Sequence, residues 1–338
     1  MALDIAREPV GTAPDRAEGR PTWILVLGAL VAVALAARFA DPQRLAWLRN
    51  LLIVFGSLLV EAFPFVVLGA FVSAAIEVFV PASAFAKIAT LPKRLQLPAA
   101  ALAGVAFPVC ECGSVPVARR LARKGLSPAA AVTFMLAAPI VNPVVIASTF
   151  VAYRGRDVVW TMVLGRFGLG FVVAMAVGWV VGAKRPDELL RGTGDPEAHE
   201  VEAGERRSRR FFGHLAGDIT FMARFLIVGA ALAAAIQTFV PQTIVDRVAG
   251  LPVISLLAMM LLAFLMSLCS ESDAFVAASF VSFGPAAQLA FLVSGPMIDM
   301  KLGALYVGTY SKGFFRTVVI VVVATTLVAT MWFQVVFG

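Results

Sequence analysis

The chain has 338 residues, of which 60% are hydrophobic and only 14% are charged. Soluble globular proteins are closer to half apolar and a quarter charged, so this composition excludes an ordinary soluble domain and indicates a polytopic membrane protein. The formal charge of +7 fits this class, because membrane proteins collect excess Lys and Arg in cytoplasmic loops. No nucleic-acid partner is expected.

The chain contains few of the residues that usually form disulfides or metal sites. Its three cysteines, Cys110, Cys112 and Cys269, are too few and odd in number for a disulfide framework. Both histidines, His199 and His214, fall in or beside the polar central segment. A histidine-rich metal site within the membrane is therefore not expected.

Taken in chain order, the sequence divides into five parts. The first apolar run, after a polar start, is longer than the hydrophobic region of a signal peptide, so it is interpreted as a retained first span. A charged segment rich in Pro and Gly then separates two apolar halves. The predicted parts are a polar cytoplasmic N-terminus (1–21), an extra N-terminal span with its loop (22–47), a first membrane repeat (48–183), a charged cytoplasmic linker (184–210) and a second membrane repeat (211–338).

The two halves resemble each other. Residues 67–81 and 227–241 share eight of 15 residues without a gap. Further along, the segment 110–114 aligns with 269–273, and the Pro-Ala-Ala that starts at Pro128 aligns with the one at Pro285. Three ordered matches indicate a repeat rather than the chance similarity of Ala- and Val-rich helices.

Loop charges indicate that the repeats are inverted. Loops 81–96 and 115–127 hold seven Lys and Arg residues, whereas their counterparts 241–256 and 274–284 hold one. Equivalent loops are thus expected on opposite sides, with the first-half loops cytoplasmic. The predicted fold is an all-α polytopic membrane protein with two inverted structural repeats, each with about three spans plus a re-entrant hairpin. One extra N-terminal span precedes them, the N-terminus is cytoplasmic and the C-terminus periplasmic or extracellular.

A Cys-Glu-Cys turn is the first candidate site. Pro108 ends the incoming half-helix and Gly113 permits a sharp reversal, so this segment is predicted to be the hairpin tip. In an extended turn, Cys110 and Cys112 would point the same way and could bind a soft ion such as Cu(I), Zn or trivalent arsenic. Alternatively, the thiols are small buried hydrophobic groups.

The second candidate site lies at the equivalent tip of the other half. Cys269 could supply a third thiolate, and Glu271 and Asp273 follow it. Acids inside a membrane are costly, so these two and Glu111 are predicted to exchange protons between facing tips. The alternative is that this tip lies at the membrane interface, in contact with water, and that Asp273 is the N-cap of the following helix.

A pair of broken helices is the third feature. Pro139 and Pro143 flank Asn142, and Pro296 precedes Asp299 at the equivalent place in the second half. Broken helices expose backbone groups to a substrate, although a simple kink is equally compatible. Further candidates for proton transfer or charge pairing are Glu61, Glu77, Arg166, Asp218 and Arg224, and Asp299 could instead pair with Lys301 near the membrane edge.

These segments resemble a known family. The segments 107–116, 118–125, 138–143 and 269–275 look like the predicted-permease family that includes the methylarsenite exporter ArsP and the YraQ-type proteins, over roughly residues 48–337. The resemblance implies an inner-membrane permease, with export of trivalent organoarsenicals in some members and proposed divalent-metal or copper efflux in others. It places the family's cysteine elements on Cys110, Cys112 and Cys269.

The sequence therefore predicts a proton-coupled secondary exporter of a soft metal or metalloid. The metal or metalloid is the transported substrate, and no cofactor is expected. A permease for a sulfur-containing or other small anion is the alternative, and a membrane thiol-redox protein the second alternative. The absence of a Gly-rich phosphate loop and of a catalytic triad argues against an enzyme. A homo-oligomer or an accessory subunit is possible. The predicted substrate-binding residues are Cys110, Cys112, Cys269, Glu111, Ser114 and Asn142, with the three cysteines as metal ligands, and the predicted proton-coupling residues are Glu111, Glu271, Asp273 and Asp299.

Overall fold

A computed structural model describes position 28 and residues 46–81, 92–107, 109–182, 207–239 and 252–337. These residues form helices and connecting turns, and none of them forms a strand. Apart from position 28, the predicted first span at 22–40 lies outside the described residues, as do most of the linker at 184–210 and Pro108. The first helix after the linker begins at Arg207, within the segment predicted as linker.

Among the described residues, each half has a long helix, four short helices and a second long helix, in that order. The first half comprises α2 (Ala46–Phe79), α4 (Lys93–Ala106), α5 (Glu111–Arg123), α6 (Pro128–Val141), α7 (Pro143–Ala152) and α8 (Val159–Val181). The second half comprises α10 (Arg207–Phe239), α12 (Pro252–Met266), α13 (Asp273–Ser279), α14 (Pro285–Ser294), α15 (Met300–Thr309) and α16 (Lys312–Phe337).

Five helical segments of the described chain are long and apolar enough to cross a bilayer, which confirms a multi-pass membrane protein. They are Trp47–Phe79, Pro128–Ala152, Val159–Val181, Arg207–Thr238 and Gly313–Val336. The apolar segment at 274–300, in contrast, is divided between α13 and α14. Pro285 explains the division, because proline fits the first turn of a helix, where its missing N–H is not needed.

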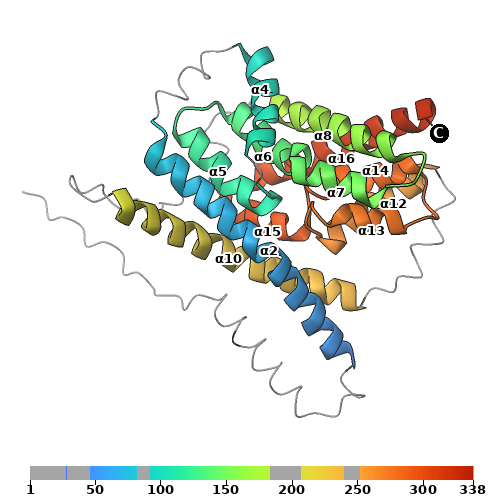
Figure 1. Ribbon diagram of the computed structural model, residues 1–338, viewed down its shortest axis with the longest axis horizontal. Helices are drawn as coiled ribbons and strands as arrows, with labels where there is room; N and C mark the ends of the chain where they lie inside the picture. The colour runs from blue at the N-terminus through green and yellow to red at the C-terminus, as the bar shows by residue number, and fades with distance from the viewer. Residues whose placement is uncertain are drawn as a thin grey trace, which may run out of the picture.

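The corresponding long helices of the two halves pack against each other and run antiparallel (Figure 1). Near the end of α2, the Phe71 ring lies 5.2 Å from that of Phe211 at the start of α10. Near the start of α2, Phe55 joins a cluster with Ala233 of late α10. Helices α8 and α16 show the same arrangement: late α8 clusters with early α16, and Gly165 of early α8 lies beside Phe333.

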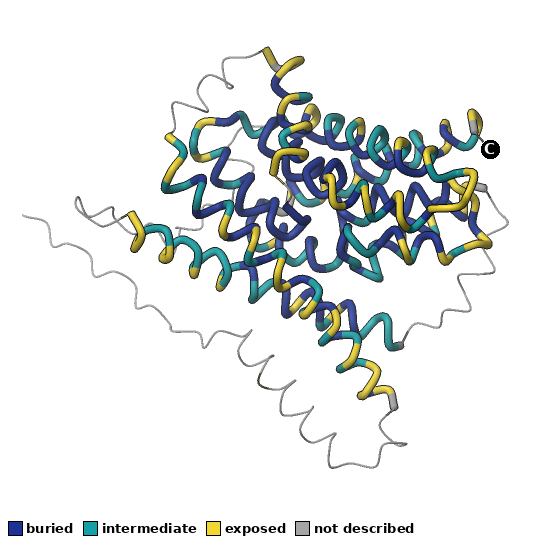
Figure 2. Tube along the Cα trace, viewed as in Figure 1, coloured by how far each residue is buried: buried dark blue, intermediate teal, exposed yellow. Residues whose placement is uncertain are grey.

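The core lies around α6, which is buried on every side from Ala129 to Val141 (Figure 2). A helix that is apolar all round suits such a position. Helix α4 packs against α6 in the first half, as α12 packs against α14 in the second. The outer helices instead expose large apolar side chains, among them Trp160, Trp179 and Trp332, which suits a surface facing lipid.

A buried ion-pair network holds the C-terminal end of α5 in place. The Arg120 side chain is 3% exposed. Its Nε donates to Ser73 Oγ at 2.6 Å, one terminal nitrogen donates to Asp218 Oδ2 at 2.9 Å, and the other lies 3.4 Å from Glu77 Oε2. Since Asp218 lies on α10, the network joins the two halves. The Lys124 ammonium adds bonds to the carbonyl oxygens of Glu77 and Val80 at the end of α2.

Gly69 lets α2 approach α5 closely. A Cβ at Gly69 would lie 2.4 Å from the Cα of Gly113, which is a clash between two backbones. We therefore expect Gly69→Ala to push the helices apart and to lower the free energy of unfolding by about 1–3 kcal/mol, seen as a lower Tm in detergent.

Gly56 on the same helix provides the control, because a Cβ there would have no atom within 4 Å. Gly56→Ala should leave stability unchanged or raise it by up to ~1 kcal/mol, since Ala favours a helix more than Gly does. Equal Tm values for the two variants would contradict the close approach.

Candidate functional site

The Cys-Glu-Cys segment begins helix α5. Cys110 is the N-cap residue, and its Sγ accepts a hydrogen bond from the Gly113 backbone N–H at 3.4 Å. Glu111 and Cys112 already belong to the helix, and the Ser114 hydroxyl donates to the Glu111 carbonyl at 2.9 Å. The prediction of an extended turn with reversal at Gly113 is therefore wrong. The chain turns before Cys110, and Gly113 serves the contact with α2.

The three thiols lie in one buried cluster. Cys110, Cys112 and Cys269 are all free, and each is 5% exposed or less. They share the cluster with apolar side chains of α2 and α10, among them Val66 and Met222. Within the described residues, no group of three or more His, Cys, Asp or Glu side chains is arranged to hold a metal ion. The thiols of both halves thus lie in one buried cluster of apolar side chains.

Lys301 of α15 lies against this cluster. Its Nζ is 3.8 Å from Cys269 Sγ, 3.9 Å from Glu111 Oε1 and 3.9 Å from Asp299 Oδ2. Lys301 is 2% exposed, so it does not lie free at the surface, and the expected Asp299–Lys301 ion pair is present inside the protein. The ammonium is instead a central charge that faces an acid of each half.

A second buried cation faces the other tip. Arg166 of α8 is fully buried, and it donates to Asp273 Oδ2 at 2.8 Å, to the Ser270 carbonyl at 3.0 Å and to Thr149 Oγ1 at 2.9 Å. Asp273 is the first residue of α13, whereas Ser272 is its N-cap residue. The acids at the starts of α5 and α13 are therefore each matched by a cation from the opposite half.

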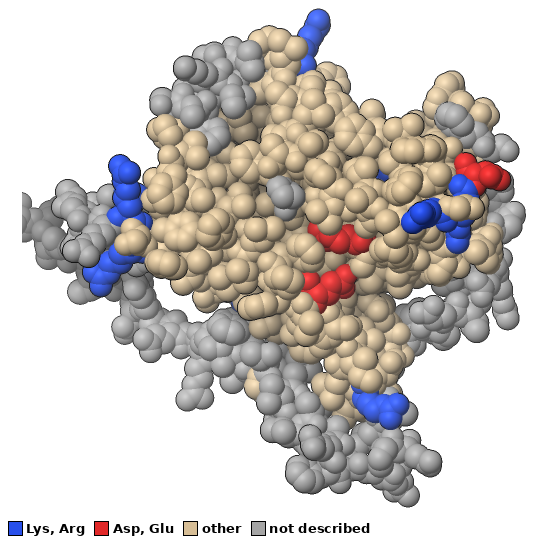
Figure 3. All heavy atoms as spheres, viewed as in Figure 1, with Lys and Arg blue, Asp and Glu red and all other residues tan. Residues whose placement is uncertain are grey.

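The serines around Glu271 extend these contacts between halves. The Ser270 hydroxyl lies 3.0 Å from Glu111 Oε2 and 3.4 Å from Glu271 Oε2, and the Ser272 hydroxyl bonds to Glu61 Oε1 on α2. Glu61 and Glu271 are only partly buried. On the face shown in Figure 3, acidic side chains lie in the middle, and basic ones lie toward the edges, where a further acidic patch also shows at the right.

Asn142 and Asp299 have the same structural role in the two halves. The Asn142 side chain caps α7 by accepting from the Val144 N–H at 2.9 Å, and Asp299 caps α15 by accepting from the Leu302 N–H at 2.6 Å. The first break lies at Asn142, because α6 continues through Pro139 and Pro143 then starts α7. Pro296 lies in the turn between α14 and α15.

Several buried polar atoms in this region have no hydrogen-bond partner among the described residues. Such atoms are uncommon in folded proteins and point to a functional role. The carboxylate atoms are Glu111 Oε1, Glu271 Oε1, Asp273 Oδ1 and Asp299 Oδ2, and the guanidinium atom is Arg166 Nε. They leave the centre able to bind a further polar group or protons.

Sequence reasoning identified the acids and thiols but not all of their partners. Arg166 and Glu61 were only secondary candidates, and Ser270 and Ser272 had no predicted role. Lys301 was considered only as a partner of Asp299. The signal for Arg166 was present, because a charged residue within an apolar span almost always faces the protein interior or a cavity.

These features define a multi-pass membrane protein with a charged, thiol-containing centre between two helical halves. The chain belongs to the predicted permease family ArsP_1, whose model matches residues 47–335. This family relation indicates a transporter rather than an enzyme.

Two relatives illustrate the family. The chain is 37% identical to the UPF0718 protein YcgR of Bacillus subtilis over 282 residues, which cover 82% of this chain and 95% of that protein. It is 34% identical over 254 residues to a Streptococcus mutans protein named "Putative two-component membrane permease complex subunit", covering 74% of this chain and 83% of that protein. No solved structure matches the chain.

The buried pair of Arg166 and Asp273 should be essential for stability. Arg166→Leu leaves the Asp273 carboxylate without its partner, so we expect a loss of about 3–5 kcal/mol, measured as a lower Tm in detergent. The double variant Arg166→Leu with Asp273→Leu should recover a large part of this loss, because it removes both charges. Arg154→Leu, at an exposed position before α8, is the control. A wild-type Tm for Arg166→Leu would contradict the pairing.

Proposed function

We propose that the chain is a secondary permease that exports a soft metal or metalloid through a thiol and carboxylate site between its halves. The observation that supports it most directly is the single buried cluster holding Cys110, Cys112 and Cys269. These thiols come from the start of α5 and from the turn before α13, so movement of one half against the other would change their separation. A site with this property suits transport by alternating access.

The inverted repeat is part of this proposal. The antiparallel packing of α2 with α10 and of α8 with α16 supports it. If the two halves are oriented oppositely in the membrane, their equivalent helices run in opposite directions. The crossed contacts of α5 with α15 and of α13 with α7 add further support. In this arrangement α4 and α5 form one re-entrant hairpin and α12 and α13 the other, with the N-terminus cytoplasmic and the C-terminus outside.

A methylated trivalent arsenical fits the site better than a bare metal cation. Structural zinc usually has four protein ligands, and no ready-made set of even three is present among the described residues. A methylarsenite molecule needs only two thiols. It forms two As–S bonds while its two hydroxyl groups leave as water with the thiol protons, and its methyl group can contact apolar neighbours such as Val66 and Met222.

The proposed proton coupling falls mainly on two of the four acids. Asp273 is occupied by Arg166, and Asp299 caps α15. Glu111 and Glu271 both lie within hydrogen-bond distance of the one Ser270 hydroxyl, which has a single proton to donate. Glu271 is partly exposed and Glu111 is buried, so the pair joins the surface to the thiol cluster.

Flux measurements with purified protein in liposomes test this function. We expect uptake of methylarsenite into inside-out proteoliposomes driven by a proton gradient, and we expect Cys110→Ser with Cys112→Ser to reduce it to the level of empty liposomes. Met259→Leu is the control, because it removes a buried sulfur outside the thiol cluster. Unchanged flux in the double Cys variant would remove the thiols from the transport site.

A small-anion permease is the second candidate, and Lys301 favours it. Its buried ammonium has only long contacts of 3.8–3.9 Å to the groups named above, so an anion could compete for it. Stabilisation by thiosulfate but not by methylarsenite, abolished by Lys301→Met, would favour this function over arsenical export. A thiol-redox role has no comparable support, because all three cysteines are buried.

A further inference from the structure

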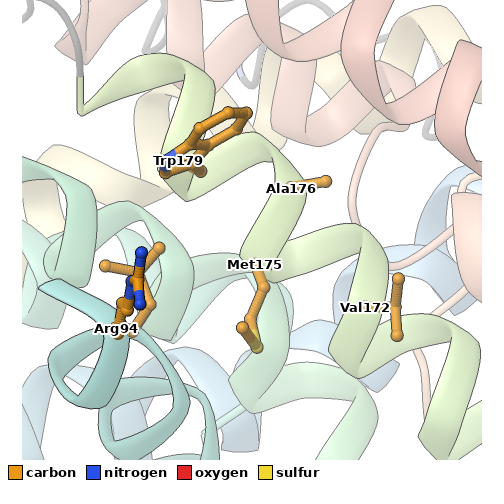
Figure 4. A pocket seen from close by; sticks show the side chains of 6 residues that line it. Arg94, Val172, Met175, Ala176 and Trp179 are labelled. Atoms are coloured by element: carbon orange, nitrogen blue, oxygen red, sulfur yellow. The ribbon is translucent and has the colours of Figure 1, made fainter.

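A groove of about 410 Å³ lies between α4 and α8, away from the thiol cluster (Figure 4). Its volume falls within the range of small-molecule sites. Most of its surface is apolar, and a single charged side chain borders it. The lining residues are Arg94, Leu97, Val172, Met175, Ala176 and Trp179.

The polar groups gather at one end of the groove. Arg94 and Trp179 lie toward the same end in Figure 4, while Val172 lies toward the other. Arg94 is exposed in the first turn of α4, and Trp179 is 74% exposed close to the end of α8. Trp and Arg at the end of a span are typical of the level of lipid headgroups.

The start of α4 at this end of the groove is basic, because Lys93 precedes Arg94 in the sequence. The positive end of the α4 helix dipole adds to the positive charge there. Membranes present anionic lipids in the cytoplasmic leaflet, where juxtamembrane basic residues attract them, and the loop charges predict the same side for this end.

We propose that the groove is a binding site for an anionic phospholipid. The phosphate contacts the Arg94 guanidinium, and the Trp179 indole N–H supplies a second donor at the headgroup level. One acyl chain lies along Val172, Met175 and Ala176. At 1.5 Å per residue these positions extend over about 6 Å of helix α8, and the groove reaches about 10 Å when Trp179 is included, which is enough for the upper part of a chain.

Such a lipid would join two helices of different roles. Helix α8 supplies Arg166 to the central site, and α4 leads into the segment that holds Cys110. An acyl chain between α4 and α8 fills space that the protein itself leaves open, so lipid binding supports the position of this arm relative to the rest of the fold.

Native mass spectrometry of the full chain tests the proposal. The protein is released from mixed micelles containing equal amounts of phosphatidylglycerol and phosphatidylcholine, and the lipids retained are counted. We expect wild type to prefer phosphatidylglycerol and Arg94→Gln to lower that preference about fivefold, the effect of one basic side chain at a membrane surface. Arg154→Gln, at an exposed position beside the other end of α8, should keep it.

Two further variants keep the test decisive if Arg94→Gln folds poorly. Arg94→Lys retains the charge and should retain the preference. Ala176→Phe fills the groove and should reduce retention of both lipids. Unaltered phosphatidylglycerol preference in Arg94→Gln or unaltered retention in Ala176→Phe would overturn the proposal. Competition by inorganic phosphate alone would also overturn it, because that result describes a site for small anions without a lipid chain.

Discussion

The fold depends on how an apolar protein holds charged groups at its centre. Arg166 pairs with Asp273, and Lys301 lies 3.9 Å from Glu111. In both cases the acid starts a short helix of one half and the cation comes from the other half. Isolated charges in such surroundings are very costly, so each half needs the other to bury its own tip. The interface between the halves and the candidate site are therefore one structure.

This arrangement differs from a rigid internal salt bridge. The Arg166–Asp273 contact is short, whereas the contacts of Lys301 with its three neighbours are all 3.8 Å or longer. Lys301 also lies beside the thiols, and the Glu111 Oε1 atom that faces it has no hydrogen-bond partner. The start of α13 is thus held by short contacts, and the start of α5 by long ones. The Arg120 network holds the C-terminal end of α5 and does not include Glu111 at its N-terminal end.

Much of this organisation was predictable from sequence. The apolar segments gave the helical membrane class, and the repeat predicted that 110–114 and 269–273 belong to equivalent places. The thiols of these two segments lie in one buried cluster. Local geometry was harder, because a Cys-Glu-Cys segment can be a turn or the first turn of a helix, and only the cap at Cys110 and the Gly69–Gly113 contact distinguish them. Pairing across halves could not be predicted, since it depends on which helix faces brought Arg166 and Lys301 inward.

The central claim is that thiols from both halves bind one cargo, and X-ray absorption at the arsenic edge tests it most directly. Arsenite can form three As–S bonds, so the number of sulfur neighbours of the bound arsenic tells how many of the three thiols bind it. No set of three donors is ready-made among the described residues, so the thiols must move together when arsenite binds. Arsenic bound to wild-type protein should then have three sulfur neighbours, and Cys269→Ser should lower that number to two. Two sulfur neighbours in wild type that persist in Cys269→Ser would place the cargo on α5 alone and contradict a site shared between the halves.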